Sequence, residues 1–475
     1  ERGGLESPVV RYALHRYFVQ NRGWYVNGLQ PRGAGWNASS ATTITSDRVP
    51  AYIQSLFEER LHGHGFGLRE LAAFAATIET LAQQEALQFL GEAYDALAMP
   101  FGPAAPKDVD EALKLYLGAM VLTRNASYMA ARSRRDGLDA FVGRAYPSWP
   151  ETSMWALDLR RSVEFTERHS RNPFGGGMDF NAAGRVVQAI GTQFGAFQNA
   201  ECASMKETLL AMEHAGTGRV RLSTFYSKSL SGHWQFTESV EYLRQLGALD
   251  ELDPERPSVV IPNYLASPGN CLASSGFYSV CCFDECEGLM AHLEGHVAAP
   301  VAAPALLAEL VASLPSDTVE APRNLSVQLL QRLDDIASHN GGLVPLHGRL
   351  FSQWMHHAFP RECPFPHATG TTNPLTPDEW LAQFGGGLQA SEEERWRHAA
   401  PEATGHDATI HAIPWTATEE LVGAKGAHLR GRWASVARLV ALLAAFAALV
   451  GQASRAWRSA AGLEAPKTKS HTHFV

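Results

Sequence analysis

The sequence predicts a mainly α-helical protein: a multi-lobed helical body with an EF-hand-like helix–loop–helix segment and one C-terminal transmembrane helix. Apolar residues recur at helical spacing in several stretches, alternating strand patterns with hairpin turns are scarce, and one uncharged run stands near the end of the chain. The 475 residues are 45% hydrophobic and 19% charged, which are globular values that allow several packed units. A net charge of −9 gives no general electrostatic reason to bind nucleic acid, so no such partner is expected.

Helical spacing first appears in the N-terminal helical region, residues 1–160. The pattern i, i+3, i+4, i+7 of an amphipathic helix is met by Leu71, Phe74, Ala75, Ile78, Leu81 and Ala82. Similar patterns cover residues 109–121 and 186–197. The main strand signal is Trp24–Val26, which an Asn-Gly turn dipeptide follows, so a hairpin is predicted there.

The next region, residues 161–250, contains a loop that resembles an EF-hand loop. A predicted helix leads into residues 213–224. Gly218 stands at the sixth loop position, where the chain turns sharply, and Val220 stands at the eighth, where paired loops form a short β-bridge. The exit helix is expected to begin at Phe225.

The calcium ligands of that loop do not match. Positions one, three, five and twelve are occupied by Glu213, Ala215, Thr217 and Thr224. The bidentate carboxylate at position twelve, which dominates calcium affinity, is therefore absent. We expect the loop shape without calcium; a calcium-responsive module and an ordinary helix–turn–helix are the alternatives. The partner loop is expected upstream, at residues 172–180.

Six cysteines permit three disulfides if the body lies in an oxidising compartment. They are Cys202, Cys271, Cys281, Cys282, Cys286 and Cys363. The connectivity stays open, but the adjacent Cys281 and Cys282 cannot readily bond each other. One cysteine of the string CCFDEC, in the Cys-containing region 251–300, is therefore expected to pair outside that string, with Cys271 as the nearest candidate. The alternative is six reduced, mostly buried thiols.

Two clusters of histidine and cysteine raise the question of a bound metal. The first lies in the helical region 301–384 and consists of His356, His357, Cys363 and His367. It is the candidate site of an alternative function, a metal-dependent or redox enzyme that holds iron, copper or zinc. The second combines Cys282 and Cys286 with His292 and His296, but roughly 9 Å of helix separates its two halves. We expect no metal at either cluster.

The end of the chain predicts a membrane attachment. Residues 385–432 are expected to form a polar stalk, residues 433–457 the transmembrane helix and residues 458–475 a short tail. The uncharged run 439–454 would reach only about 24 Å along a helix, but tryptophans bracket it where interfacial aromatics belong. A small-residue face for other membrane proteins and lipid is formed by Ala437, Ala441 and Ala445. The alternative is a buried or interfacial helix.

The placement of the folded mass predicts the orientation. Because nearly all of the chain precedes the span, the large N-terminal body is expected on the lumenal or extracellular side. Three sequons, at Asn37, Asn125 and Asn324, are glycosylation candidates there. The chain starts at Glu1 without methionine, which indicates a processed N-terminus.

Four strings stand out together: HRYFVQNRGWYVNGL, MEHAGTGRVRLSTFY, SSGFYSVCCFDECEGLM and VPLHGRLFSQWMHHAFPRECPFPH. With these strings, over residues 11–380, the chain resembles a family of single-span membrane-anchored proteins abundant in dinoflagellates and related algae. The resemblance implies a thylakoid or secretory membrane and a subunit of a larger algal membrane complex, photosynthetic complexes included. It transfers no catalytic residue.

The signatures of common enzyme classes are absent from the sequence. There is no GxxxxGK[ST] phosphate loop, no GxGxxG motif after a strand and no GxSxG nucleophile elbow. We therefore expect a non-enzymatic, membrane-anchored structural or partner-binding protein, whose N-terminal body binds partner proteins.

Overall fold

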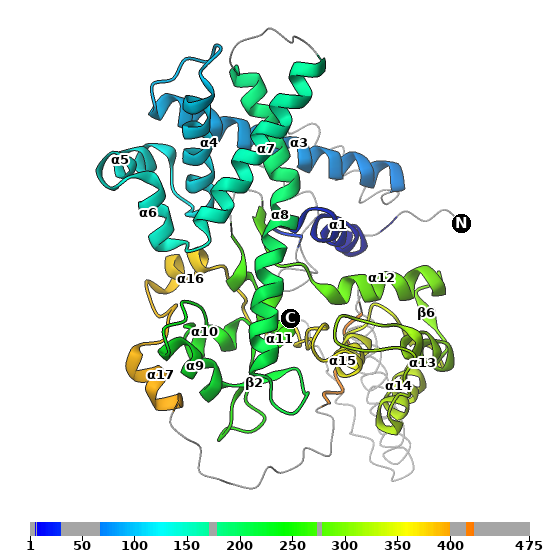
Figure 1. The fold of residues 1–475 in the computed structure, drawn as a ribbon. Helices are drawn as coiled ribbons and strands as arrows, with labels where there is room; N and C mark the ends of the chain where they lie inside the picture. The colour runs from blue at the N-terminus through cyan, green and yellow to red at the C-terminus, as the bar shows by residue number, and fades with distance from the viewer. Residues whose placement is uncertain are drawn as a thin grey trace, which may run out of the picture. The chain divides into compact units, whose positions relative to one another are not determined.

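The computed structural model describes residue 5 and residues 7–29, 67–170, 178–272, 278–399 and 415–421 (Figure 1). Helices dominate these residues, which confirms the mainly α prediction. In chain order the elements are α1 (Ser7–Arg22), β1 (Trp24–Val26), α3 (Leu68–Ala96), α4 (Pro106–Val121), α5 (Ala126–Asp136), α6 (Leu138–Ala145), α7 (Trp149–Ser170), α8 (Phe180–Ala211), β2 (Arg219–Arg221), α9 (Leu222–Leu230), α10 (Val240–Gln245), β3 (Leu249–Asp250), β4 (Ser258–Val260), α11 (Ile261–Leu265), the 3₁₀ helix η2 (Pro268–Asn270), β5 (Tyr278–Val280), α12 (Glu285–Val297), β6 (Val301–Ala302), α13 (Pro304–Ser313), α14 (Val327–His339), β7 (Val344–Pro345), α15 (Arg349–Ala358), α16 (Pro377–Phe384) and α17 (Glu392–Ala399).

The transmembrane part of the predicted fold class is wrong for the described helices. Within the ranges given above, none is both long and apolar enough to cross a membrane. The long helices α3 and α8 are amphipathic instead, because charged side chains such as Glu92 and Lys206 interrupt their apolar runs. The segment that carried the prediction, 433–457, lies outside the described residues, and so do its Ala437, Ala441 and Ala445 face and the tail.

The first core joins α1 and α3–α7 to the N-terminal half of α8. Its α3 face includes the fully buried Phe74 and Ile78, which confirms the amphipathic helix predicted there. Gly195 of α8 allows close approach to α1, because a Cβ at this position would lie 2.1 Å from the carbonyl oxygen of Arg22. Asp179 caps the start of α8 by accepting a hydrogen bond of 2.7 Å from the backbone N–H of Ala182.

The strand at Trp24–Val26 does not form the predicted hairpin. It pairs antiparallel with β5, and Trp24 lies opposite Val280 in the register. The ring of Trp24 stacks on that of Tyr278, with centroids 4.1 Å apart. The strand signal was therefore right, but the partner comes from a distant part of the chain.

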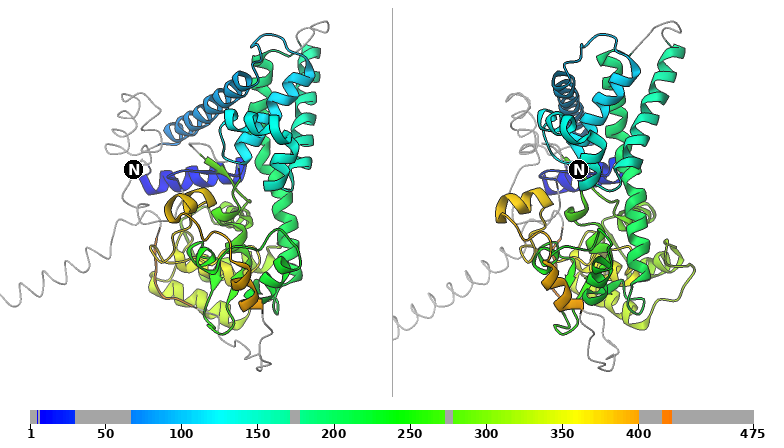
Figure 2. Two further views of the ribbon diagram at one scale, coloured as in Figure 1. Left: turned by 90° about the vertical axis from the view of Figure 1, so that its left-hand side faces the viewer. Right: turned by 60° about the vertical axis from the view of Figure 1, so that its left-hand side comes forward.

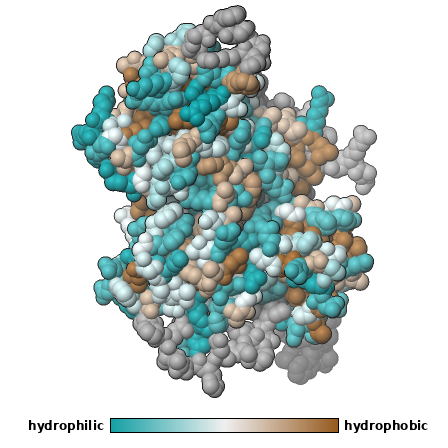
Figure 3. All heavy atoms as spheres, in the orientation of Figure 1, coloured by the Kyte–Doolittle hydropathy of each residue, from teal (hydrophilic) through white to brown (hydrophobic). Residues whose placement is uncertain are grey.

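Two further cores complete the body. The second surrounds the C-terminal half of α8 and contains α9–α11 and the three-stranded sheet in the order β2-β4-β3. The third is formed by α12–α15 with the β6-β7 pair. Figure 2 shows α8, which contributes to the first two cores, as one continuous helix. On the face shown in Figure 3, apolar residues are interspersed with hydrophilic ones.

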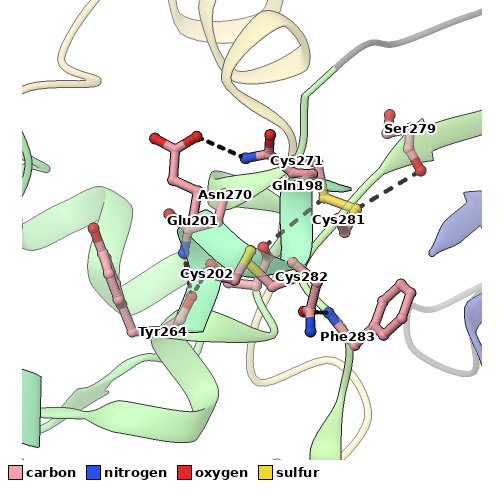
Figure 4. Close-up of a disulfide and its surroundings, with 12 residues drawn as sticks. Gln198, Glu201, Cys202, Tyr264, Asn270, Cys271, Ser279, Cys281, Cys282 and Phe283 are labelled. Carbon is pink, nitrogen blue, oxygen red and sulfur yellow. Dashed lines mark hydrogen bonds between the residues drawn. A yellow bond between two sulfur atoms is a disulfide. The ribbon is translucent and has the colours of Figure 1, made fainter. Parts of the chain in front are cut away.

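Three disulfides brace the body, and all six cysteines take part; Cys202–Cys282 lies within the second core and Cys286–Cys363 within the third. Cys202 bonds Cys282, Cys271 bonds Cys281, and Cys286 bonds Cys363. Figure 4 shows the first two side by side, since Cys281 and Cys282 are neighbours in the chain. The predicted bridge from Cys271 into the CCFDEC string is confirmed.

Removal of each of the two neighbouring disulfides should lower the free energy of unfolding by a different amount. Cys202 and Cys282 are 80 residues apart, whereas Cys271 and Cys281 are 10 apart. The larger loop loses more entropy in the unfolded chain, so C202A/C282A should lower the free energy of unfolding by about 4.5 kcal/mol and C271A/C281A by about 2.7 kcal/mol. Denaturant unfolding without reductant measures both. Equal losses, or a greater loss for the short loop, would contradict this explanation.

Candidate functional site

A helix–loop–helix lies at the predicted position. Helix α8 ends at Ala211, β2 covers loop positions seven to nine, and α9 follows. Val220, at position eight, lies opposite Val259 in β4, which is the bridge that paired EF-hand loops form. The exit helix begins at Leu222, three positions before the predicted Phe225.

The predicted partner loop at 172–180 is wrong, because the loop pairs downstream, with the chain around β4. Two backbone hydrogen bonds relate the loops symmetrically: Leu222 N–H donates to the carbonyl of Pro257 and Ile261 N–H donates to that of Gly218, each at 2.9 Å. Of the predicted segment, Met178 forms an isolated bridge with Ala104 instead, and residues 172–177 lie outside the described ranges.

A proline explains why the sequence did not predict the loop around β4 as the partner. If Val259 is taken as position eight, Pro257 occupies position six, where a recognisable EF-hand loop has glycine. The remaining signal was the apolar run of β4 leading directly into a short helix, α11.

An arginine satisfies the carboxylate at position one of the first loop. Both oxygens of Glu213 face the guanidinium of Arg361, with Nε at 3.0 and 2.9 Å and Nη2 at 2.7 Å. Gly218 N–H donates to Glu213 Oε1 at 2.5 Å. Hydrogen bonds to Glu213 raise the pKa of Arg361 above its ordinary value. The guanidinium thus takes the interactions that position one would offer an ion.

The turn at Gly218 depends on glycine for two reasons. Its φ is +71°, and a Cβ there would lie 2.0 Å from the carbonyl oxygen of Pro360. Arg361 follows directly in the chain, so the same close approach delivers the guanidinium to Glu213. At the other ligand positions, Ala215 and Thr224 bring no carboxylate, and the hydroxyl of Thr217 donates to the carbonyl of His214 at 2.7 Å.

The predicted His/Cys cluster does not assemble as a set of ligands. Cys363 is in a disulfide, and the fully buried His356 donates from Nδ1 to the carbonyl of Cys363 at 2.7 Å. Burial holds the pKa of His356 well below its usual range, so this ring is neutral. His367 donates from Nε2 to the carbonyl of Gly247 at 2.7 Å, and His357 packs against Trp415, with centroids 6.3 Å apart.

Within the described part of the chain, no group of three or more His, Cys, Asp or Glu side chains is arranged to hold a metal ion. In the second cluster Cys282 and Cys286 belong to different disulfides. Of the sequons, Asn125 uses its side chain to cap α5 by accepting from Tyr128 N–H at 2.8 Å, Asn324 is exposed, and Asn37 lies outside the described residues.

A cleft of about 810 Å³ opens between α1 and α12. It is lined by Tyr12, Ala13, Arg16, Tyr17, Gln20, Asn21, Ala291, Glu294, Gly295, Ala298, Ala299, Pro300 and His347. Sequence reasoning missed it because its walls are far apart in the chain. The signal that was present is the polar and aromatic stripe of Tyr12, Arg16 and Gln20 at four-residue spacing in α1.

Charges within the cleft are paired with one another. Arg16 forms ion pairs with Glu287 and Glu294, and His347 Nε2 lies 2.9 Å from Glu294 Oε1. The ring of Tyr12 meets that of His347 edge-on at 5.4 Å. Burial alone would raise the pKa of Glu294, but the hydrogen bonds with His347 and Arg16 outweigh it and hold the pKa below its ordinary value.

No protein-family model, curated protein or solved structure matches the chain. The resemblance to a dinoflagellate family therefore stays a prediction.

Removal of the guanidinium at Arg361 should destabilise the loop pair. Because Glu213 is 7% exposed and would keep a poorly compensated charge, R361A should cost about 2 kcal/mol of unfolding free energy. R361K should lose less, since it retains the charge without the two-pronged geometry. The control is R161A, whose partner Asp158 is largely exposed and which should change little. A melting temperature of the unaltered chain that rises by several degrees with calcium would contradict this account of the loop.

Glu294 should contribute stability with a defined pH dependence. Because its folded pKa is depressed, its contribution is present above the unfolded glutamate pKa of about 4.3 and disappears as the pH falls through the folded pKa. E294Q should therefore be less stable than the unaltered chain at neutral pH and match it in acid. Urea unfolding across that range measures the difference, with the exposed Glu309 changed to Gln as control. A difference that persists unchanged in acid would refute the ion-pair explanation.

Proposed function

We propose that this chain is a non-enzymatic partner-binding protein, and that its partner is a protein segment held in the cleft between α1 and α12. The observation that carries the proposal is the cleft itself, about 810 Å³ in volume and open to solvent. It accepts an extended chain rather than a fully enclosed small molecule.

The lining favours a peptide. Ala291, Gly295 and Ala299 are small, so a backbone approaches closely, while Tyr12 and Tyr17 offer rigid aromatic surfaces beside them. Tyr17 is 39% exposed, and its OH donates to Glu79 Oε1 at 3.3 Å. Aromatic side chains and arginine are enriched at surfaces that bind protein partners, and the lining contributes both.

The charge pattern argues against a phosphate or nucleotide as the bound group. Arg16, a cation of the lining, is already paired with Glu287 and Glu294, and His347 also faces Glu294. An anionic ligand would have to compete with two carboxylates for the same guanidinium. A neutral or mixed-charge segment meets no such competition.

The remainder of the body supports a binding role in an oxidising compartment. Three disulfides are present in the body, as expected of a protein outside a reducing environment. The Glu213–Arg361 contact closes the EF-hand-like loop without an ion, so the calcium-responsive alternative gains no support. His356 and His367 donate to backbone carbonyls, so the metal-enzyme alternative gains none either.

Two glycines of α12 provide a matched test. A Cβ at Gly295 or at Gly288 would meet no heavy atom within 4 Å, but only Gly295 of the two lines the cleft. A photo-crosslinking residue placed at Gln20 of the full chain should form an adduct with a discrete partner protein. Because G295W fills the cleft, it should reduce the amount of this adduct about tenfold. G288W should leave the amount unchanged.

A crosslinker outside the cleft serves as the control for the one at Gln20. The same crosslinker at the exposed Leu252, outside the lining, is the negative control. If Gln20 yields the same adducts as Leu252, or if G295W and G288W behave alike, the cleft is not the binding site.

A further inference from the structure

Residues 415–421 lie as an extended segment along the start of α15. The N–H of Arg349 donates to the carbonyl of Glu420 at 3.0 Å, and Gly348 forms an isolated antiparallel bridge with Leu421. This contact places a short extended segment against the backbone at the N-terminus of α15. Peptides bind in a similar way to protein backbone that has unsatisfied hydrogen-bond donors or acceptors.

A buried guanidinium recognises the middle of the segment. Arg349 is 6% exposed, and it donates from Nε to the carbonyl of Thr418 at 2.7 Å and from Nη2 to the carbonyl and hydroxyl of Thr416 at 2.8 and 2.7 Å. Its Nη1 donates to the carbonyl of Pro366 at 2.9 Å, which holds the side chain in place. Gln353 Oε1 accepts from the Thr416 hydroxyl at 2.8 Å.

Two carboxylates hold the end of the segment. Glu419 Oε1 accepts from the N–H of Leu350 at 3.1 Å, and Glu420 accepts from the N–H and hydroxyl of Thr369 at 3.0 and 2.7 Å. Gly348 precedes α15 and has no side chain to cap it, so the carboxylate of Glu419 supplies the acceptor that the helix start lacks.

The segment is held by polar contacts rather than by burial. Residues 416–418 are exposed, and none of residues 415–421 is a buried member of a core. Trp415 is the apolar anchor: it is partly buried against the third core, with the guanidinium of Arg332 5.1 Å from its ring centroid. Release of residues 415–421 would leave the three cores packed, because none of these residues is a buried core member. It would also expose the guanidinium of Arg349, which binds backbone carbonyls of the segment.

We propose that the groove formed by residues 348–353, residues 366–369 and Arg332 is a peptide-recognition site, and that residues 415–421 are its ligand in cis. The ligand class is an extended peptide with a tryptophan, a threonine directly after it, and adjacent carboxylates four and five residues beyond the tryptophan. The site shares no residue with the lining of the cleft between α1 and α12, although His347 of that lining adjoins it in the chain, and the proposal does not depend on the proposed function.

The test weakens the attachment of residues 415–421 to their own chain and supplies the same segment as a separate peptide. In the full chain, E419A/E420A should release residues 415–421, so a fluorescent peptide of residues 413–423 should bind this variant about tenfold more tightly than the unaltered chain, whose groove is occupied. Hydrogen exchange at residues 415–421 should accelerate in the same variant. Binding should weaken again when T369V is added, which removes the hydroxyl donor to Glu420 and keeps the backbone N–H donor and the contacts of the buried Arg349.

Each other outcome overturns the proposal. Equal peptide affinity for the variant and the unaltered chain would mean that the groove is not occupied in cis. Unchanged hydrogen exchange in E419A/E420A would mean that these carboxylates do not hold the segment. A concentration-dependent dimer of the unaltered chain that the peptide dissociates would assign the segment to a second copy instead.

Discussion

The stretch of chain from residue 278 to residue 286 belongs to all three cores, and the arrangement of the body depends on it. Tyr278 and Val280 are buried in the first core, Cys282 is buried in the second, and Cys286 bonds Cys363 of the third. Disulfides fix this stretch within two of the cores: Cys282 bonds Cys202 of α8 in the second core, and Cys286 bonds Cys363 in the third. The backbone of residues 278–286 therefore links the three cores over a short distance in the chain.

A buried lysine makes a further connection beside residues 278–286. Lys206 of α8 is 6% exposed and places Nζ 2.5 Å from Glu285 Oε2, beside Cys286, and 4.0 Å from Glu362 Oε1, beside Cys363. Glu362 in turn accepts hydrogen bonds from the hydroxyls of Ser316 and Thr318 at 2.8 and 2.6 Å. Since a buried charge is costly without partners, this network fixes how α8, α12 and the end of α15 meet.

Sequence reasoning succeeded where the signal is local and failed where it is tertiary. The amphipathic α3 and the loop around Gly218 follow from spacing within one segment, and Cys271–Cys281 spans a short loop. The other two disulfides depend on how whole helices approach, and no spacing encodes that. The same limit explains Trp24–Val26, whose strand was found but whose partner was not, and the cleft, whose walls the sequence separates.

Both helices that line the cleft, α1 and α12, are attached to the stretch 278–286. Helix α1 leads through Gly23 into β1, which pairs with β5, and the N–H of Cys281 donates to the carbonyl of Gly23 at 3.0 Å. Helix α12 begins at Glu285, three residues after Cys282, and the disulfide-bonded Cys281 and Cys282 lie between β5 and this helix. Ion pairs from Arg16 to α12 then fix the walls further along. The cleft is therefore preformed, so a segment that binds there pays little for ordering the protein, and its affinity depends mainly on the fit of its own chain.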